Sequence, residues 1–411
     1  MEHKIIDAIS EPEILEKLYR KDRQGFILAF NKVTSDLAST DLIRFWQIRL
    51  QSPPQQKVDF TPLFVSLILV VFLTWIPQIF HFSSAQKFYF NSRNLFLIGF
   101  AGLSLYELIK NKGTQLIYRL GFAVFYSLMA LHLNTLIDQP EKQTFLLALL
   151  HSPIICWFMF GLVFINRQQN EKSPWAGFLR YNGDLLLFSG LIMICWMILF
   201  GITVSLLESL DIYFSDQLML DLLITAAAIS PLIASFAIER IPVLANKLIP
   251  LIARIFNPIL LIVLVIYLII IMQAGNNIYG ERNFLIVFNI ILFTVLAVIL
   301  FSLSNVRGNR YDKFQLTILY LLTLFTCALN LIALSAILYR LFTWGITPNK
   351  LAVTGMNLIA FANLIKIGIN LFQVKSFNRE PESVNHSITS FLPFYATWAI
   401  IIVIVFPIIF A

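Results

Sequence analysis

The strongest constraint on this chain is a series of long apolar runs separated by short polar connectors. Crossing about 30 Å of hydrocarbon at 1.5 Å per residue takes roughly 20 apolar residues, and most of these runs reach that length. Each run is therefore expected to cross a membrane as a helix. We predict eleven spans, at residues 60–81, 94–110, 116–137, 144–165, 184–207, 218–238, 251–273, 284–303, 314–338, 351–374 and 391–411.

Composition agrees with run length. Of the 411 residues, 58% are hydrophobic and 13% are charged, a balance that a water-soluble fold of this size could not bury. The chain is predicted to be an all-α polytopic transmembrane bundle over residues 59–411, preceded by a small helical cap over residues 1–58. The second span is the weakest because it is short and carries Glu107. An alternative for the second and third spans is one re-entrant hairpin.

The net charge of +7 does not indicate nucleic-acid binding, because the Lys and Arg residues are dispersed in short connectors. That dispersal is typical of residues that orient a membrane protein. A cytoplasmic N-terminus places more of them in the cytoplasm, so we predict that orientation. The cytoplasmic set is Lys110, Lys112, Arg119, Arg167, Lys172, Arg180, Arg240, Lys247, Arg307, Arg310, Lys313, Lys375 and Arg379, and the outer set is Lys87, Arg93, Lys142, Arg282, Arg340 and Lys350.

No motif points to an enzyme. The chain lacks His-Glu-x-x-His, Gly-x-Ser-x-Gly and the Gly-x-x-x-x-Gly-Lys-Ser/Thr phosphate loop, so we expect no catalytic residue, no cofactor and no ATP-driven motor of its own. Cys156, Cys195 and Cys327 all lie inside apolar runs and are expected to be small core residues. Neither a disulfide framework nor a metal site is predicted from them.

Residues 1–58 show a helical pattern with polar flanks. Ser10 is expected to begin a capping box with Glu13, a second helix is expected around residues 25–37, and Thr40 is expected to cap a third. The segment mixes nine basic with eight acidic residues, whereas binding to a lipid surface favours an excess of basic ones. A cytoplasmic protein partner is therefore a candidate for this segment.

The tenth span carries the most informative polar residues, because a polar group at membrane depth is costly unless it is paired or hydrated. Four of them share one helix face, and three asparagines on this and neighbouring spans are candidate partners. They either line a hydrated path, or Lys366 extends to the interface while the amides bond across a helix contact. The face consists of Asn363, Lys366, Asn370 and Gln373, and the further asparagines are Asn357, Asn330 and Asn289.

Three further groups of polar residues are weaker candidates for a site. Arg254, Asn257 and Pro258 form a possible kink or ion site at the start of the seventh span, although an interfacial arginine there is ordinary. Two histidines in neighbouring spans are expected to bond to backbone carbonyls rather than to relay protons. Four carboxylates around one outer loop are a weak candidate for binding cations and fit a solvated loop equally well. The two histidines are His132 and His151, and the four carboxylates belong to Glu208, Asp211, Asp216 and Asp221.

One connector is similar to a known sequence pattern. Residues 340–353 read RLFTWGITPNKLAV, and within them Trp344 to Lys350 match an aromatic-Gly-Leu/Ile-Thr-Pro-Asn-Arg/Lys turn. The stretch resembles the bacterial membrane family called domain of unknown function 4153, in which this turn joins two late membrane helices. The resemblance implies a bacterial envelope protein, which we expect in the inner membrane, and assigns no catalytic residue. Physically, Gly345 suits a tight exit from one helix and Thr347 suits the cap of the next.

These observations lead to two expectations about function. The first is a permease that moves a small solute or ion, with Asn330, Asn357, Asn363, Lys366 and Asn370 as its polar lining. The alternative is a scaffold or sensor subunit that does not transport and recruits a cytoplasmic partner through residues 1–58. Membrane lipid is the only other partner expected.

Overall fold

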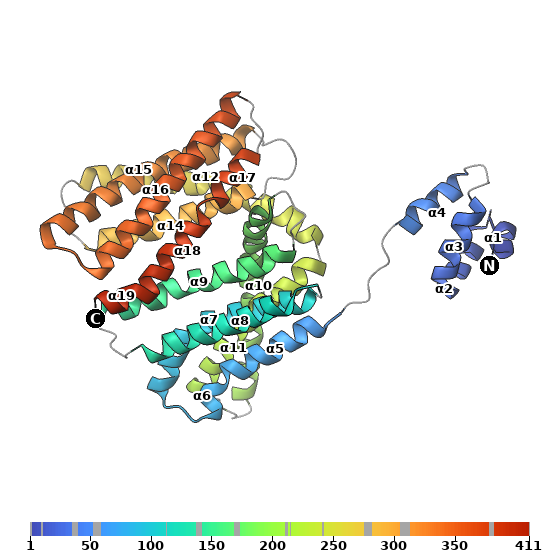
Figure 1. Cartoon of the computed structure of the whole chain (residues 1–411), viewed down its shortest axis with the longest axis horizontal. Helices are drawn as coiled ribbons and strands as arrows, with labels where there is room; N and C mark the ends of the chain where they lie inside the picture. Colours follow the sequence, from blue (N-terminus) through green and yellow to red (C-terminus); the bar gives the residue numbers. More distant parts are fainter. Residues whose placement is uncertain are drawn as a thin grey trace. The chain divides into compact units, whose positions relative to one another are not determined.

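A computed structural model describes residues 2–9, 11–34, 40–51, 59–111, 113–136, 142–167, 173–209, 213, 215–240, 242–274, 282–304, 313–377 and 382–410. Throughout these residues the regular structure is helical, and no strand occurs (Figure 1). The chain divides into two compact units, Met1–Phe60 and Thr61–Ala411, which are treated separately below. The all-α bundle predicted from the apolar runs is confirmed.

The first unit consists of α1 (Glu2–Asp7), α2 (Pro12–Lys21), α3 (Arg23–Thr34) and α4 (Asp41–Gln51). Their apolar faces meet around Trp46, which is 2% exposed and packs 5.2 Å from the Phe26 ring. Thr40 caps α4 as predicted, since its Oγ1 accepts from the Ile43 backbone N–H at 3.3 Å. The cap expected for α2 was wrong: the helix starts at Pro12 with Glu11 as its N-cap residue, and Ser10 lies outside the described residues.

The second unit has nine helices, among the residues described, that are long and apolar enough to cross a membrane. They coincide with the third to eleventh predicted spans, so this is a multi-pass membrane protein. The helices are α8 (Leu116–Thr135), α9 (Gln143–Arg167), α10 (Pro174–Glu208), α11 (Asp216–Arg240), α12 (Pro242–Ala274), α14 (Arg282–Ser304), α15 (Lys313–Trp344), α16 (Pro348–Phe377), and the last span of α17 (Glu382–Thr389), α18 (Leu392–Ile400), the π-helix η1 (Ile401–Val405) and α19 (Phe406–Ile409).

The first two predicted spans differ from the structure in their bounds. Residues 60–81 do not form one helix, because α5 (Thr61–Thr74) stops before α6 (Ile76–Ile79), where Pro77 cannot donate a helical hydrogen bond. The second predicted span begins ten residues too late: α7 runs from Ser84 to Lys110, and Ser83 and Gln86 form a capping box at its start. At 27 residues, or about 40 Å, α7 is long enough to cross without a hairpin.

The position of α7 explains its low hydropathy. This helix packs against α5, α8, α9 and α11, so much of its surface faces protein rather than lipid. Arg93, Asn94, Ser104 and Glu107 are all buried there with partners on other helices or on α7 itself. Polar residues at these depths are tolerated because the surrounding helices bond to them.

The turn between α15 and α16 has the geometry expected from its residues. Gly345 has a φ of +74°, in the left-handed region that glycine enters without steric cost. Thr347 Oγ1 accepts from the Lys350 backbone N–H at 3.4 Å, and Pro348 is the first residue of α16. The Lys350 ammonium closes the turn by donating to the carbonyl of Gly345 at 2.8 Å.

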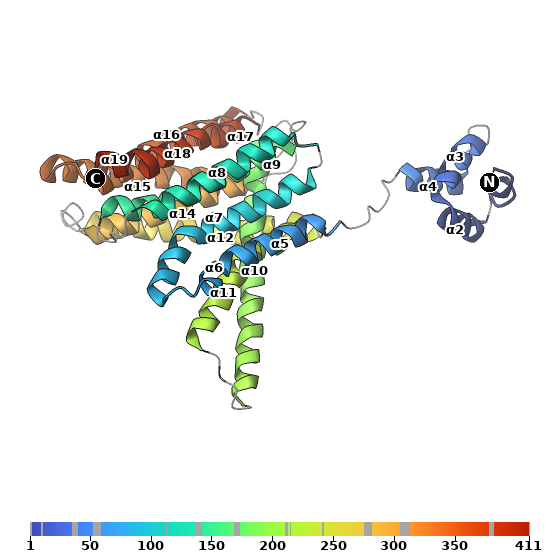
Figure 2. The ribbon, with the colours of Figure 1, turned by 60° about the horizontal axis from the view of Figure 1, so that its bottom comes forward.

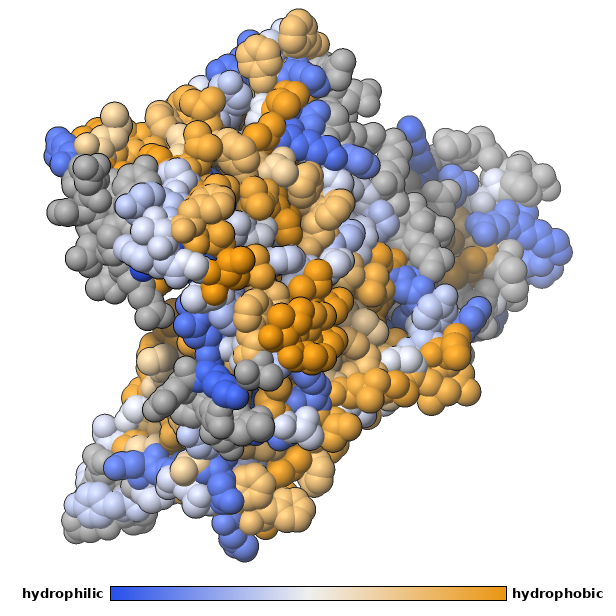
Figure 3. All heavy atoms as spheres, turned by 60° about the vertical axis from the view of Figure 1, so that its left-hand side comes forward, coloured by the Kyte–Doolittle hydropathy of each residue, from blue (hydrophilic) through white to orange (hydrophobic). Residues whose placement is uncertain are grey.

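Lipid exposure varies strongly between helices. In the most apolar stretch of α15, half of the residues are buried inside the protein, whereas in that of α10 only 6% are buried. The second half of α10 extends with α11 away from the other long helices (Figure 2). Apolar side chains, coloured orange, cover much of the surface seen in Figure 3, as expected for a unit whose outer faces contact hydrocarbon.

Candidate functional site

The first part of the candidate site is an amide cluster formed by Asn289 of α14, Asn330 of α15 and Asn357 of α16. Asn330 Nδ2 donates to the Asn357 backbone carbonyl at 3.1 Å, and Asn357 Nδ2 donates to Asn289 Oδ1 at 2.9 Å. Asn330 and Asn357 are fully buried, and the Oδ1 atom of each has no hydrogen-bond partner. The structure thus brings together three of the predicted residues and leaves two acceptor oxygens available.

The second part, the Lys366 patch, lies on another side of α16 and faces α17 and α18. Lys366 Nζ donates to Ser390 Oγ at 2.8 Å, and Asn370 Nδ2 donates to Ser387 Oγ at 2.5 Å. Asn363, fully buried, donates through Nδ2 to Tyr395 OH at 3.4 Å, while its Oδ1 has no partner. The predicted lining therefore splits in two, because Asn357 is not on the face that carries the other three.

A break in the last membrane span positions the partners of Lys366. Between α17 and α18, Pro393 has no N–H to donate to the carbonyl four residues earlier, so the helix stops at Thr389 and restarts at Leu392. Ser390 and Phe391 occupy the gap, and the Phe391 ring centroid is 5.7 Å from Lys366 Nζ. The ammonium thus lies at the C-terminal end of α17, where helix dipoles favour positive charge.

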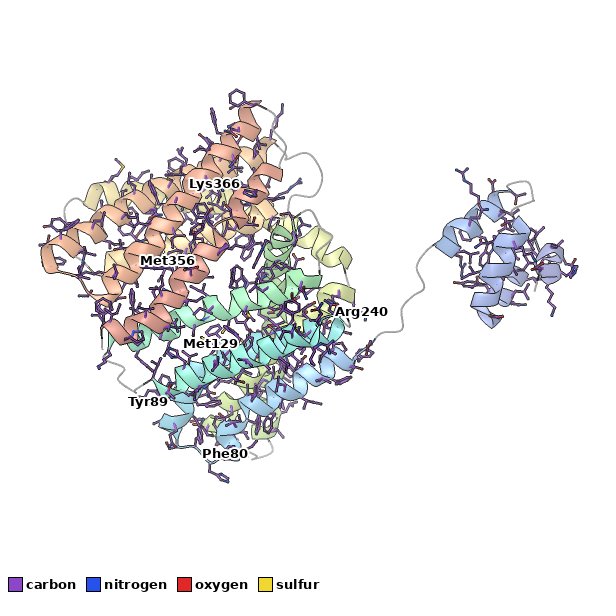
Figure 4. The ribbon with its side chains drawn as sticks, in the orientation of Figure 1. Phe80, Tyr89, Met129, Arg240, Met356 and Lys366 are labelled. Atoms are coloured by element: carbon purple, nitrogen blue, oxygen red, sulfur yellow. The ribbon has the colours of Figure 1, made fainter. Side chains whose placement is uncertain are left out.

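A cavity of about 650 Å³ adjoins both parts of the site. Residues of α7, α9, α14, α16 and α18 line it, and most are apolar. Its polar wall includes Asn289 and Tyr395, the partners of Asn357 and Asn363. Figure 4 marks Met356, which lines the cavity, and Lys366 on the same helix. The cavity therefore touches one residue of each part, while Asn330, Asn357, Asn363 and Lys366 do not line it.

Three amides elsewhere in the unit use both of their ends. Asn94 and Asn134 exchange two hydrogen bonds, at 3.1 and 2.9 Å. Asn257 of α12 donates to Ser302 Oγ at 3.0 Å and accepts from it at 3.2 Å. Such amides hold helices together, and they differ from the amides at the candidate site, whose oxygens are unused.

The group around Asn257 does not assemble into an ion site. The Asn257 side chain is occupied by Ser302, the Arg254 side chain is exposed, and α12 continues through Pro258. The histidines bond to carbonyls as expected: His132 Nε2 lies 3.0 Å from the Val403 carbonyl, and His151 Nδ1 lies 2.9 Å from that of Leu147. Each ring nitrogen must carry the proton, because a carbonyl only accepts.

Two ion-paired groups were not foreseen from the sequence. Lys87 of α7 pairs with Asp221 of α11 at 3.1 Å, so one carboxylate of the outer acidic group has a cation after all. Lys110 contacts both Glu107 and Glu239, and Tyr106 OH donates to Glu239 Oε2 at 3.1 Å. Asp221 and Glu239 lie on α11, far from α7 in the sequence, so no local signal identifies them as partners of Lys87 and Lys110.

Within the described residues, the acidic group around the loop between α10 and α11 shows no metal centre. Asp211 lies outside the described residues, and Asp216 is exposed. Among the residues that the structure covers, no group of three or more His, Cys, Asp or Glu side chains is arranged to hold a metal ion. The helices and side chains described here therefore direct attention to α14, α15, α16 and the broken last span.

Comparison with protein-family models, curated proteins and solved structures found no match to this chain.

Proposed function

We propose that this membrane protein is a permease for a small polar solute or ion, which passes between α14, α16 and the broken last span. The observation that carries the proposal is the set of three buried side-chain oxygens without a partner, on Asn330, Asn357 and Asn363. Leaving a buried acceptor unpaired costs about 1–3 kcal/mol, so three of them in one region favour a role other than holding helices together.

The chemistry of the two parts suits a polar solute. Amide oxygens accept hydrogen bonds from N–H or O–H groups and coordinate cations, while Lys366 offers a positive charge one turn from Asn363. A solute with donor groups and a negative charge would satisfy both parts at once. Breaks in membrane helices beside buried charges are a recurring feature of transporter binding sites, and the α17–α18 break supports the proposal in this way.

The test is uptake into vesicles that contain the purified full-length protein, screened over a panel of amino acids, organic acids and inorganic ions. Lys366→Ala and Asn357→Leu should each reduce uptake of any transported solute at least tenfold. Lys375→Ala is the matched control, because Lys375 is an exposed lysine on the same helix. Unchanged uptake by Lys366→Ala for every solute that the unaltered protein moves would refute the site.

A second function, a scaffold or sensor subunit in a bacterial envelope, is favoured by the N-terminal unit. This unit has its own apolar core, and α2 and α4 enclose a groove of about 530 Å³. Phe45 lines the groove and is 56% exposed, so its ring is accessible to a partner. A groove with an exposed aromatic residue is the kind of surface that anchors a partner peptide.

Site-specific crosslinking in cells tests this alternative. A photoreactive residue at position 45 should capture one discrete partner, and the Glu13→Lys substitution, in the same groove, should weaken capture. A photoreactive residue at Ile6, exposed but outside the groove, serves as the control. Equal capture from both positions would show that the groove is not the binding surface.

A further inference from the structure

A second apolar groove lies on the other side of the membrane unit, away from the site proposed above. It has a volume of about 630 Å³, with α7 as its floor and α5 and α8 as its walls. Its floor runs from Phe90 to Ile109, a rise of about 28 Å, close to the thickness of the hydrocarbon layer. The groove opens beside α8, and only 22% of the most apolar stretch of this helix is buried in the protein.

Three polar side chains along this groove are already paired. Tyr126 presents its ring to the groove, while its hydroxyl donates to the Cys156 carbonyl at 3.3 Å and lies 3.4 Å from Ser104 Oγ. At one end, Asn94 and Asn134 bond to each other. The body of the groove is thus mostly apolar and presents a surface that suits a hydrocarbon chain.

The other end of the groove carries a charge. Arg119, in the first turn of α8, lines the groove and is exposed, and no acidic side chain pairs with it within the described part of the chain. An arginine at the membrane surface attracts phosphate groups and forms bidentate hydrogen bonds with them. With Arg119 at its end, the groove matches the orientation of a lipid molecule, which has its charged head at the membrane surface and its tail in the hydrocarbon.

We propose that this groove binds one anionic phospholipid, with an acyl chain between α5 and α8 and the headgroup phosphate on Arg119. The lipid comes from the leaflet on the Arg119 side. Its occupancy depends on two separate features, the charge of Arg119 and the open space beside Ala123, an exposed residue that lines the groove. The two features can be removed independently.

The experiment is native mass spectrometry of the full-length protein released from nanodiscs that contain equal parts of phosphatidylglycerol and phosphatidylcholine. The unaltered protein should retain one phosphatidylglycerol in preference to phosphatidylcholine. Arg119→Gln should lower that preference about fivefold, the contribution of one basic residue at an anionic surface. Ala123→Trp should fill the groove and abolish retention of either lipid.

Two control variants isolate these effects. Val124→Trp adds the same ring at the next position of α8, which is exposed but does not line the groove. Lys375→Gln removes an exposed basic residue at a distant place. Both should retain lipid as the unaltered protein does. Equal retention of the two lipids, an unchanged preference in Arg119→Gln, or lipid retention by Ala123→Trp would each overturn the proposal. Since Arg119 is exposed, its variant remains informative even if Ala123→Trp misfolds.

Discussion

Replacing His132 with leucine should destabilise the membrane unit by about 1–2 kcal/mol, because it removes a donor from a carbonyl whose α-helical partner is missing. In an α-helix the Val403 carbonyl would accept from the N–H of residue 407, but that residue is Pro407 and has none. The π-helix η1 occupies this stretch, and His132 Nε2 donates to the Val403 carbonyl from α8 at 3.0 Å. In hydrocarbon no water can replace it.

The same reasoning predicts a rescue. In Pro407→Ala, the new N–H can bond to the Val403 carbonyl, so a subsequent His132→Leu should cost less than about 0.5 kcal/mol. The coupling between the two positions should therefore be about 1 kcal/mol. Reversible unfolding in mixed micelles, followed by tryptophan fluorescence, measures all four variants of the cycle.

His151→Leu is the matched control for this cycle. Its Nδ1 bonds to the Leu147 carbonyl of its own helix, so its cost should be the same whether residue 407 is proline or alanine. If His132→Leu also costs the same in both backgrounds, the histidine is not replacing the bond that Pro407 cannot make, and the reasoning is refuted.

Three further predictions concern other parts of the chain. Asn330→Leu should change the free energy of unfolding by less than about 1 kcal/mol while abolishing vesicle uptake. Asn257→Leu should destabilise the membrane unit by about 1–2 kcal/mol, because it leaves Ser302 unpaired, and unfolding in micelles together with uptake assays distinguishes the two variants. Trp46→Ala should destabilise the N-terminal unit by about 3–5 kcal/mol, seen as faster hydrogen exchange over residues 2–51. The hydrogen bond and charge of Lys32 lower the pKa of Glu2, so the stability from this ion pair is present above the ordinary glutamate pKa and is lost as pH falls through the lowered pKa. Hydrogen exchange measured as a function of pH should show that loss, and the Lys32→Ala variant should lack this pH dependence.

Local patterns were sufficient for most of the secondary structure. Apolar run length predicted the membrane helices, and the residues of the turn before α16 predicted its Gly345 exit and its Thr347 cap. The bounds of α7 were missed because its first turns are too polar for a lipid-facing helix. Other helices hold polar residues of that stretch, since Lys87 pairs with Asp221 of α11 and Asn94 bonds to Asn134 of α8, and hydropathy carries no information about neighbouring helices.

The candidate site was only partly accessible in the same way. Helical spacing correctly placed Asn363, Lys366 and Asn370 on one face of a helix, and the structure shows all three directed at the broken last span. Spacing could not show that Asn357 faces α14 and α15, or that Tyr395 and Ser390 complete the Lys366 patch.

The sequence by itself determined that this chain is a multi-pass helical membrane protein with a separate N-terminal unit, because membrane thickness and backbone hydrogen bonding translate directly into the length and polarity of each segment. Only the tertiary structure decided which polar groups are paired and which are not. Lys87 pairs with Asp221, and Asn257 bonds to Ser302. The side-chain oxygens of Asn330, Asn357 and Asn363 have no hydrogen-bond partner. Pairing depends on which helices lie side by side, a property of the packed bundle that no single helix encodes.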